Sequence, residues 1–365
     1  MNVFPKSYRF ADVLSIINGR NQKKVEAADG QYPIYGSGGI MGWANDYICP
    51  ENTVVIGRKG SINNPIYVDR KFWNVDTAFG LVPNRNLLLP RYLFYFCVCF
   101  DFEKLNTTVT IPSLTKTNLM QIKMSLPPLG EQEKIICRLD KLCHLIELKK
   151  EQLKQLDVLA KSRFIEMFGD SKAKFQRLGD ICSVGSSKRV FVEELQTKGI
   201  PFFRGTEVGR LAEDKDIEPT LFITEEHYIA LCKHTGKPKI GDLLLPSICP
   251  DGRVWCVNSE RPFYFKDGRV LWVKVPDAIN GCYLRFALSQ SIIENYSTLA
   301  SGITFAELKI VTLKEAPIPL PPLALQNEFA AFIEQLDKSK FSVSQQQKTV
   351  DSYQRGIILQ LAGGE

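Results

Sequence analysis

The sequence predicts an α+β protein in which two globular, mainly-β domains are joined by two long helices. The helices are expected to form an antiparallel coiled coil within a pseudo-two-fold internal repeat. The heptapeptide LPPLGEQ at Leu126–Gln132 returns as LPPLALQ at Leu320–Gln326, a shift of 194 residues (320 − 126). Each copy follows a segment rich in strand formers and precedes a polar, helix-forming segment. Solenoid repeats have periods of roughly 20–50 residues, so this spacing indicates a duplicated domain with a spacer.

Composition is that of an ordinary globular protein. The 365 residues are 44% hydrophobic and 24% charged, which is typical of folded domains, and the length allows two or three of them. No apolar run approaches the roughly 18 residues that cross a bilayer, and the first residues lack the apolar segment of a signal peptide. We therefore expect a cytoplasmic protein without membrane contact.

The ten cysteines and three histidines do not predict a metal site. No Cys-x-x-Cys pair occurs in the chain, whereas a zinc site needs four ligands at close spacing. In a reducing cytosol, we expect the cysteines to be small buried apolar residues.

The positive charge lies on the two globular segments. The whole chain has a net charge of +6. Residues 1–125 carry 14 Lys and Arg against 9 Asp and Glu, and residues 171–318 carry 20 against 18. The two spacer segments are neutral or slightly acidic. A positive excess confined to the globular domains suits a polyanionic partner that those domains contact.

The first domain, residues 1–125, is predicted to consist of short strands separated by turns rich in Gly and Asn. The expected strands are Tyr32–Tyr35, Thr53–Ile56, Ile66–Val68 and Ala78–Val82. Gly-rich turns lie at Gly36–Gly39 and Gly57–Gly60. This pattern is typical of a mainly β fold. Pro90–Phe102 is interpreted as a buried helix that begins at a proline, although its aromatic residues also suit a strand.

The second domain, residues 171–318, repeats this order. Ile200–Gly205 matches Tyr32–Ser37 at a shift of 168, and Gly241–Leu245 stands where Glu51–Val55 stands.

Towards the end of the domains, the shift between matching residues grows from 168 to 194. Thr304-Phe305 matches Thr110-Ile111 at this larger shift. We therefore place an insertion in the charged stretch Val208–Lys239 of the second domain. The two domains are similar in sequence near their ends and differ in their middle segments. This pattern predicts one scaffold that presents two different surfaces.

The spacers, residues 126–170 and 319–365, are predicted to be long helices. Glu131–Phe168 contains no proline or glycine over 38 residues, and such a helix would be about 57 Å long. Apolar residues recur at alternating steps of four and three, which is a heptad pattern. The residues expected to pair the helices are Leu139, Leu142, Ile146, Leu153 and Leu156 in the first spacer, and Ile333, Leu336, Val343 and Val350 in the second. The alternative is two amphipathic helices that each pack on their own domain; the duplication favours pairing of the two spacers.

This order of segments resembles the specificity subunit of type I restriction–modification systems. In that family a globular domain, Leu-Pro-Pro-Leu-x-x-Gln and a long helix are repeated once, and the resemblance covers nearly the whole chain. The supporting motifs are Tyr32–Ile40, Gly57–Ser61, Asp76–Phe79, Pro201–Gly205 and Gly241–Leu244. One departure is that Ala324-Leu325-Gln326 stands where the first copy has Gly130-Glu131-Gln132.

The resemblance implies a non-catalytic reader of double-stranded DNA. Each globular segment would be a target recognition domain that reads one half of a split, asymmetric sequence, and the spacers would set the gap. The spacers, with the same seam residues, would also dock two modification subunits that carry adenine methyltransferase activity and bind S-adenosylmethionine. A restriction subunit that uses ATP and Mg²⁺ can join them. This chain itself would bind no cofactor and no metal.

Candidate DNA contacts are loop residues with positive charge, forked donors or amides, because phosphates attract cations and base edges need directional donors. The candidates are Tyr35, Ser37, Gly38, Arg58, Lys59, Asn63, Arg70 and Lys71 in the first domain, and Lys188, Arg189, Arg204, Arg210 and Arg253 in the second. The alternative for each cation is a solvated surface charge. For Gly36–Gly39 it is an ordinary tight turn.

Two other classes of function remain open from the residues alone: a DNA adenine methyltransferase or nuclease that acts alone, and a coiled-coil protein-assembly module. Asn64–Tyr67 approaches a methyltransferase tetrad but lacks its second proline. Asp69–Lys71 and Asp214–Asp216 are interpreted as surface charge runs rather than as the paired carboxylates of a nuclease. The sequence contains no Walker loop for ATP.

Overall fold

The computed structural model describes residues 6–106, 112–169, 174–301 and 306–361, with side chains described as far as residue 357. The chain forms two compact units, the first made of Met1–Leu153 and Ser342–Glu365 and the second of Lys154–Phe341. Each unit therefore contains one globular domain and a part of each long helix. The matched pairs Thr110-Ile111 and Thr304-Phe305 lie outside the described residues.

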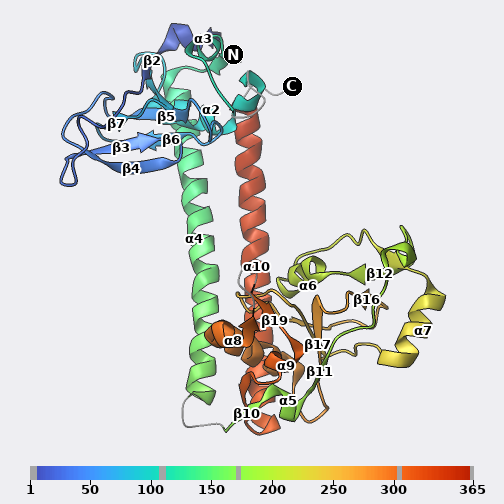
Figure 1. Cartoon of the computed structure of the whole chain (residues 1–365). Helices are drawn as coiled ribbons and strands as arrows, with labels where there is room; N and C mark the ends of the chain where they lie inside the picture. The colour runs from blue at the N-terminus through green and yellow to red at the C-terminus, as the bar shows by residue number, and fades with distance from the viewer. Residues whose placement is uncertain (1–5, 107–111, 170–173, 302–305, 362–365) are drawn as a thin grey trace. The chain divides into compact units, whose positions relative to one another are not determined.

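The two longest elements are α4 (Leu129–Phe168) and α10 (Leu323–Leu361) (Figure 1). Both begin inside the repeated heptapeptide, directly after its second proline, where a helix tolerates a preceding proline because the first N–H groups have no intrahelical partner. Among the described residues, no helix combines the length and apolar character needed to cross a membrane.

The globular part of the first unit contains two sheets. A four-stranded antiparallel sheet has the order β2-β8-β5-β6, and a three-stranded sheet has the order β4-β3-β7. In the smaller sheet β3 pairs with β4 antiparallel and with β7 parallel. The strands are β2 (Leu14–Asn18), β3 (Tyr32–Gly36), β4 (Gly39–Ala44), β5 (Thr53–Gly57), β6 (Ile66–Val68), β7 (Trp73–Asn74) and β8 (Ala78–Pro83). The four strands predicted for this domain are thus present as β3, β5, β6 and β8.

Helix α2 (Pro90–Cys99) covers the larger sheet of the first unit. It begins at Pro90, as predicted, and ends three residues before the predicted Phe102. Its buried face includes Leu93 and Phe96, which share a core with Leu139 of α4. Burial of each such side chain contributes roughly 1.5–3 kcal/mol, so α4 belongs to the hydrophobic core of the first domain.

The second unit repeats both sheets. Its four-stranded sheet has the order β11-β17-β14-β15 and its three-stranded sheet the order β13-β12-β16, in which β12 and β16 are parallel. The strands are β11 (Ser183–Gly185), β12 (Ile200–Phe203), β13 (Phe222–Ile223), β14 (Leu243–Pro246), β15 (Trp255–Cys256), β16 (Tyr264–Phe265) and β17 (Val270–Lys274). Helix α8 (Gly281–Leu299) takes the place of α2.

Each unit also carries a short strand pair that joins the start of the domain to the segment before the long helix. In the first unit β1 (Lys6–Arg9) pairs antiparallel with β9 (Lys123–Leu126). In the second, β10 (Phe175–Arg177) pairs in the same way with β20 (Pro317–Pro319). The heptapeptides therefore follow equivalent strands.

The two domains diverge directly after the strands β3 and β12. In the first unit the turn Gly36–Gly39 leads into β4, with Gly39 at a φ of +122° that favours glycine. In the second unit the chain continues into α6 (Gly205–Ala212), β13 and α7 (Glu225–Thr235) instead. This is the predicted insertion, and it replaces a strand by two helices and a shorter strand.

In the second unit, α4 and α10 run in opposite directions. Asp157 pairs with Lys340 at 2.7 Å and Arg163 pairs with Glu328 at 3.1 Å, so residue numbers rise along α4 as they fall along α10. Aromatic rings fill the joint between these helices and α8. The rings of Phe164, Phe168, Tyr283, Phe286 and Phe329 contact one another at centroid distances of 5.1–6.1 Å.

Candidate nucleic-acid interface

Two Gly-rich turns of the first unit lie against each other. We call Gly36–Gly39 and Gly57–Gly60 the paired turns. A Cβ atom on Gly57 would lie 3.0 Å from the Cβ of Ser37 and 2.3 Å from the carbonyl oxygen of Ser61. The Ser37 hydroxyl lies 3.9 Å from the equivalent point on Gly60. The structure therefore brings together the two turns that carry Ser37, Gly38, Arg58 and Lys59, although 17 residues (40–56) separate these turns in the sequence.

The backbone of the second paired turn is fixed by hydrogen bonds, and the guanidinium of Arg58 lies 5.8 Å from the centre of the Phe79 ring. The N–H groups of Arg58 and Lys59 both donate to the carbonyl oxygen of Thr77, at 2.8 and 3.2 Å. Gly60 has a φ of +81° and donates to Pro112. Both cationic side chains are exposed. Such an arrangement presents two positive charges on a rigid turn, which is suited to phosphate contact.

The cations Arg70 and Lys71 lie beside aromatic rings of the same unit. Lys71 Nζ donates to the Tyr47 hydroxyl at 3.1 Å and lies 4.6 Å from the centre of that ring. This hydrogen bond raises the pKa of Lys71. Arg70 pairs with Asp69 at 3.2 Å, with both side chains exposed. Burial raises the pKa of Tyr35, and the positive charge of Arg70 partly offsets this increase.

Asn63 has a structural role in the first unit. Its amide donates to Asp101 at 3.1 Å and its oxygen accepts from the N–H of Phe102 at 2.7 Å. Both groups of the side chain are therefore used to hold the segment that follows α2.

Strand β4 adds exposed apolar side chains that the sequence analysis did not single out. Ile40, Met41 and Trp43 are 57%, 63% and 41% exposed, on an edge strand next to the paired turns. Exposed apolar edge strands are uncommon because they invite association. Their sequence, a short apolar run, looks the same as that of a buried strand, so no signal in it marks them as surface residues.

In the second unit, four of the five predicted cations have partners within their own domain. Arg204 pairs with Glu207 at 2.6 Å, Arg189 with Asp267 at 3.2 Å, and Arg253 with Asp251 at 2.8 Å. Arg210 donates to the carbonyl oxygen of Asp216 at 2.8 Å. Lys188 is exposed and forms no ion pair within the part of the chain that the structure describes.

A buried glutamine joins each domain to the start of its helix. Gln132 is fully buried; its Oε1 accepts from the N–H of Leu89 at 2.9 Å and its Nε2 donates to Leu87 and Pro127 at 2.8 Å. Gln326, 1% exposed, accepts from the N–H of Asn280 at 3.0 Å and donates to Pro321 at 2.8 Å. Because Leu89 and Asn280 precede the first residues of α2 and α8, each glutamine caps the helix that packs on its sheet.

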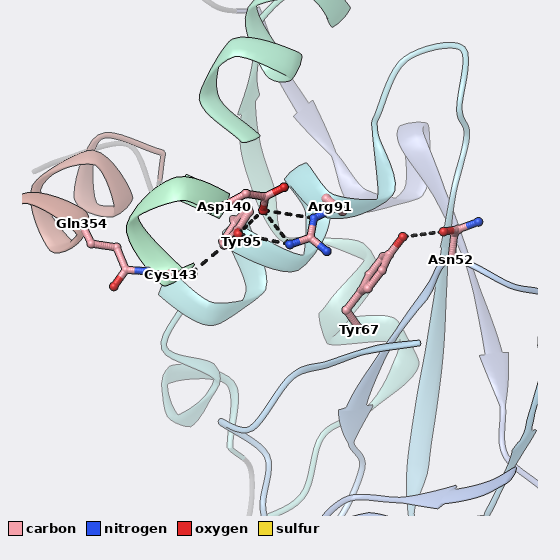
Figure 2. Close-up of polar contacts among 7 residues, drawn as sticks. All are labelled: Asn52, Tyr67, Arg91, Tyr95, Asp140, Cys143 and Gln354. Atoms are coloured by element: carbon pink, nitrogen blue, oxygen red, sulfur yellow. Dashed lines mark hydrogen bonds and ion pairs between the residues drawn. The ribbon is translucent and has the colours of Figure 1, made fainter. Parts of the chain in front are cut away.

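A polar cluster strengthens this joint in the first unit (Figure 2). Arg91 of α2 pairs with Asp140 of α4 at 2.6 Å, and the Tyr95 hydroxyl donates to the same carboxylate. Burial and this hydrogen bond raise the pKa of Tyr95 well above its usual range. The Cys143 sulfur of α4 lies 3.7 Å from the same Tyr95 hydroxyl and accepts a hydrogen bond from Gln354 of α10 at 3.0 Å. The second unit has a corresponding pair, Arg285 with Asp337 at 3.3 Å.

The predicted seam residues lie at different depths. The buried ones are Leu139, Ile146, Ile333, Leu336 and Val343, and the half-buried ones are Leu142, Leu153, Leu156 and Val350. Leu139 and Leu142 contact the core of the first domain, whereas Ile333 and Leu336 contact that of the second. These residues therefore also pack on their domains, which is the alternative that the sequence left open.

Within the described ranges, no group of three or more His, Cys, Asp and Glu side chains gathers at metal-binding distance. The surfaces described above offer charge, hydrogen-bonding groups and apolar side chains. These are the elements of nucleic-acid recognition.

Comparison with known proteins identifies the relatives of this chain. A family model described as the type I restriction modification DNA specificity domain matches residues 5–158 and again residues 170–350. The chain is also similar to a putative type I restriction enzyme specificity subunit from Haemophilus influenzae, with 24% identity over 354 residues that cover 92% of this chain and 88% of the relative.

Solved structures show the same fold. The S subunit of the type I restriction–modification system from M. genitalium matches with a TM-score of 0.57 and 16% identity, over 99% of this chain and 97% of that chain. A chain from a study of complex assembly and conformational transition in the type I system matches with a TM-score of 0.60 and 17% identity, over 100% of this chain and 99% of that chain.

Proposed function

Because this chain belongs to the type I restriction–modification DNA specificity family, in which it is a sequence-recognition subunit, we propose that each of its two units reads one half of a split DNA site. The subunit is non-catalytic in this proposal. The adenine methyltransferase activity and S-adenosylmethionine belong to two modification subunits, and ATP with Mg²⁺ belongs to restriction subunits that can join them.

One observation carries this proposal: the two domains share a scaffold and differ in what the scaffold presents. Strands β3 and β12 occupy the same place in equivalent three-stranded sheets. After β3 the first unit has the turn Gly36–Gly39 and the apolar strand β4, whereas after β12 the second unit has α6, β13 and α7. Two surfaces that differ on one scaffold suit the reading of two different half-sites, which together form an asymmetric sequence.

In the first unit, the paired turns and strand β4 would contact DNA. Arg58 and Lys59 would contact phosphates, since their turn is fixed by backbone hydrogen bonds and their side chains are exposed. Ile40 and Met41 are apolar and exposed beside them, and apolar side chains distinguish thymine by its methyl group.

The long helices would set the gap between the half-sites as an antiparallel coiled coil. Helix α4 has 40 residues, which is about 60 Å at 1.5 Å per residue, or roughly 17 base pairs at 3.4 Å each. Half-sites about one helical turn apart present the same face of the duplex. Spacer length would then act as a ruler for the recognised gap.

The same helices would dock the modification subunits. Exposed large apolar side chains on them support this role: Leu148, Val158, Leu159 and Ile165 on α4, and Phe341 on α10. Apolar residues that remain exposed on a long helix are typical of protein interfaces.

The proposed function is tested by mapping methylated bases in DNA exposed to the chain with its modification subunits and S-adenosylmethionine. One split, asymmetric motif should carry the modification, and the chain alone should modify nothing. Methylation by the isolated chain would show instead that it is an enzyme. Methylation without any split motif would contradict the role in sequence recognition.

A further inference from the structure

A cluster of exposed basic residues, four lysines and a histidine, surrounds the end of α7 in the second unit. Lys233 and His234 lie in the last turn of the helix, and Lys237 follows it. Lys274 comes from the end of β17, and Lys188 from the segment after β11. We call these five residues the α7 basic cluster; three of them lie within the predicted insertion Val208–Lys239.

Defined contacts bring these segments together. Lys274 Nζ donates to the carbonyl oxygen of Thr235 at 3.0 Å and lies 4.1 Å from the centre of the Trp272 ring. The Tyr264 hydroxyl accepts from the backbone N–H of Lys188 at 2.9 Å and also contacts the Thr235 side chain. Thr235 thus joins the end of α7 to both β17 and the Lys188 segment.

The charge of this cluster is not compensated inside the domain. Among the described residues, no carboxylate forms an ion pair with any of its side chains. Nearby Asp242 is 4% exposed. Its carboxylate accepts from Trp272 Nε1, from the N–H of Val275 and from the N–H of Lys239, at 2.9–3.0 Å. By contrast, Arg189, Arg204 and Arg253 have acidic partners.

Stabilisation of α7 alone does not explain the cluster. Cations in the last turn of a helix interact favourably with its macrodipole, which accounts for Lys233. Lys237, Lys188 and Lys274 lie outside the helix. Their gathering at one place concentrates positive potential that has no acidic counterpart, which is the feature that attracts a polyanion.

We propose that the α7 basic cluster binds the phosphates of the DNA backbone and contributes affinity without sequence preference. This inference rests on the proposed function, because it assumes that the second unit contacts DNA. Within that unit, α7 lies at the edge away from the long helices (Figure 1). The insertion would therefore extend the contact of the domain with the backbone beyond the bases that it reads.

The test uses the full chain assembled with its modification subunits. The variant K233Q/K237Q removes two exposed charges and leaves Thr235, Tyr264 and Trp272 in place. Dissociation constants are measured against KCl concentration for two duplexes of equal length, one with the methylated motif and one without. K309Q/K314Q is the matched control, because Lys309 and Lys314 are exposed lysines of the same unit that flank α9 (Ile310–Leu313).

The expected result is a salt slope smaller by about two in K233Q/K237Q, since each phosphate contact contributes about 0.9 to it. Affinity for both duplexes should fall by the same factor, on the order of tenfold at moderate salt, with their ratio unchanged. The single variant K188Q should reduce the slope by about one, and the control should leave it unchanged.

Three results would overturn the proposal: an unchanged slope in both K233Q/K237Q and K188Q, a changed ratio between the two duplexes, or loss of assembly with the modification subunits before DNA is added. The last would show that the cluster binds an acidic protein surface. A different result would contradict the proposed function itself: the wild-type complex would then bind the two duplexes with equal affinity.

Discussion

Gln132 accepts a hydrogen bond from the backbone N–H of Leu89 at 2.9 Å, across 43 residues of sequence. Gln326 repeats this contact with Asn280 at 3.0 Å. In both units the glutamine of the repeated heptapeptide satisfies the start of a helix that packs on the sheet. The heptapeptide is therefore more than a linker, because its last residue fastens the long helix to the domain before it.

We expect Gln132→Ala to destabilise the first unit by about 2–4 kcal/mol, because it leaves a buried N–H and buried carbonyl groups without partners. The measurement is urea unfolding followed by tryptophan fluorescence. Gln152→Ala, which changes an exposed glutamine of the same helix, should alter stability by less than about 0.5 kcal/mol. Equal midpoints for the two variants would contradict the capping role.

The ion pair between Arg91 and Asp140 should contribute modestly. Their side chains are 42% and 39% exposed, so solvent screens the attraction, and the Tyr95 hydroxyl shares the same carboxylate. A double-mutant cycle with Arg91→Gln and Asp140→Asn should give a coupling of about 1 kcal/mol that decreases as salt is added. A coupling of zero at low salt would show that the contact has no energetic role.

Gly57→Ala should distort the second paired turn, because the new Cβ would meet the Ser61 carbonyl oxygen at 2.3 Å, and should push it from the first turn, where the Ser37 Cβ would lie 3.0 Å away. We expect the complex to bind its DNA on the order of tenfold more weakly, which corresponds to about 1.4 kcal/mol. Gly130→Ala is the control, since no atom lies within 4 Å of the added carbon; alanine is the better helix former there. Unchanged DNA affinity in Gly57→Ala would remove the paired turns from the interface.

Cys282 should react as a thiolate near neutral pH. The hydrogen bond from Cys256, together with the positive charge of Arg285, lowers its pKa below the ordinary value for a thiol, against the opposing effects of burial and of Asp337 and Glu334. A lowered pKa means that the reactive form persists as pH falls. The rate of alkylation of Cys282 by iodoacetamide should therefore rise with a midpoint clearly below the ordinary value of about 8.5.

Cys256→Ala is the comparison for this thiol, because it removes the hydrogen-bond donor with a small change in side-chain volume. The midpoint should then move to higher pH, towards the ordinary value of about 8.5. A midpoint near 8.5 already in the wild-type chain would show that the two sulfurs do not interact in solution.

The scaffold could be predicted from the sequence because its signals are local or repeated. Strands such as Thr53–Gly57 are short apolar runs between turn residues. The long helices follow from runs without proline or glycine, Glu131–Phe168 in α4 and residues 323–355 in α10. The insertion follows from the change of shift between the two domains. Each of these features depends on neighbouring residues or on comparison of one half of the chain with the other.

The surfaces could not be predicted in the same way, because they depend on contacts between distant residues. Arg253 pairs with Glu213, and Lys274 reaches Thr235, through the folding of separate segments. The sequence around a lysine or arginine does not show whether an acidic side chain from a distant segment will pair with it in the folded domain. Arg189, which the sequence proposed, pairs with Asp267 at a separation of 78 residues, and Lys274, which it passed over, reaches Thr235 at a separation of 39. Arg204 and Arg253 also have acidic partners, but these lie only three and two residues away.

Exchange of one domain tests the central claim most directly. Residues 175–318 would be replaced by the equivalent segment of a relative that methylates a different sequence, and the methylated motif would be mapped with the modification subunits present. We expect one half of the motif to change while the other half and the gap stay the same. A motif that changes in both halves, or in neither, would contradict the reading of one half-site by each unit.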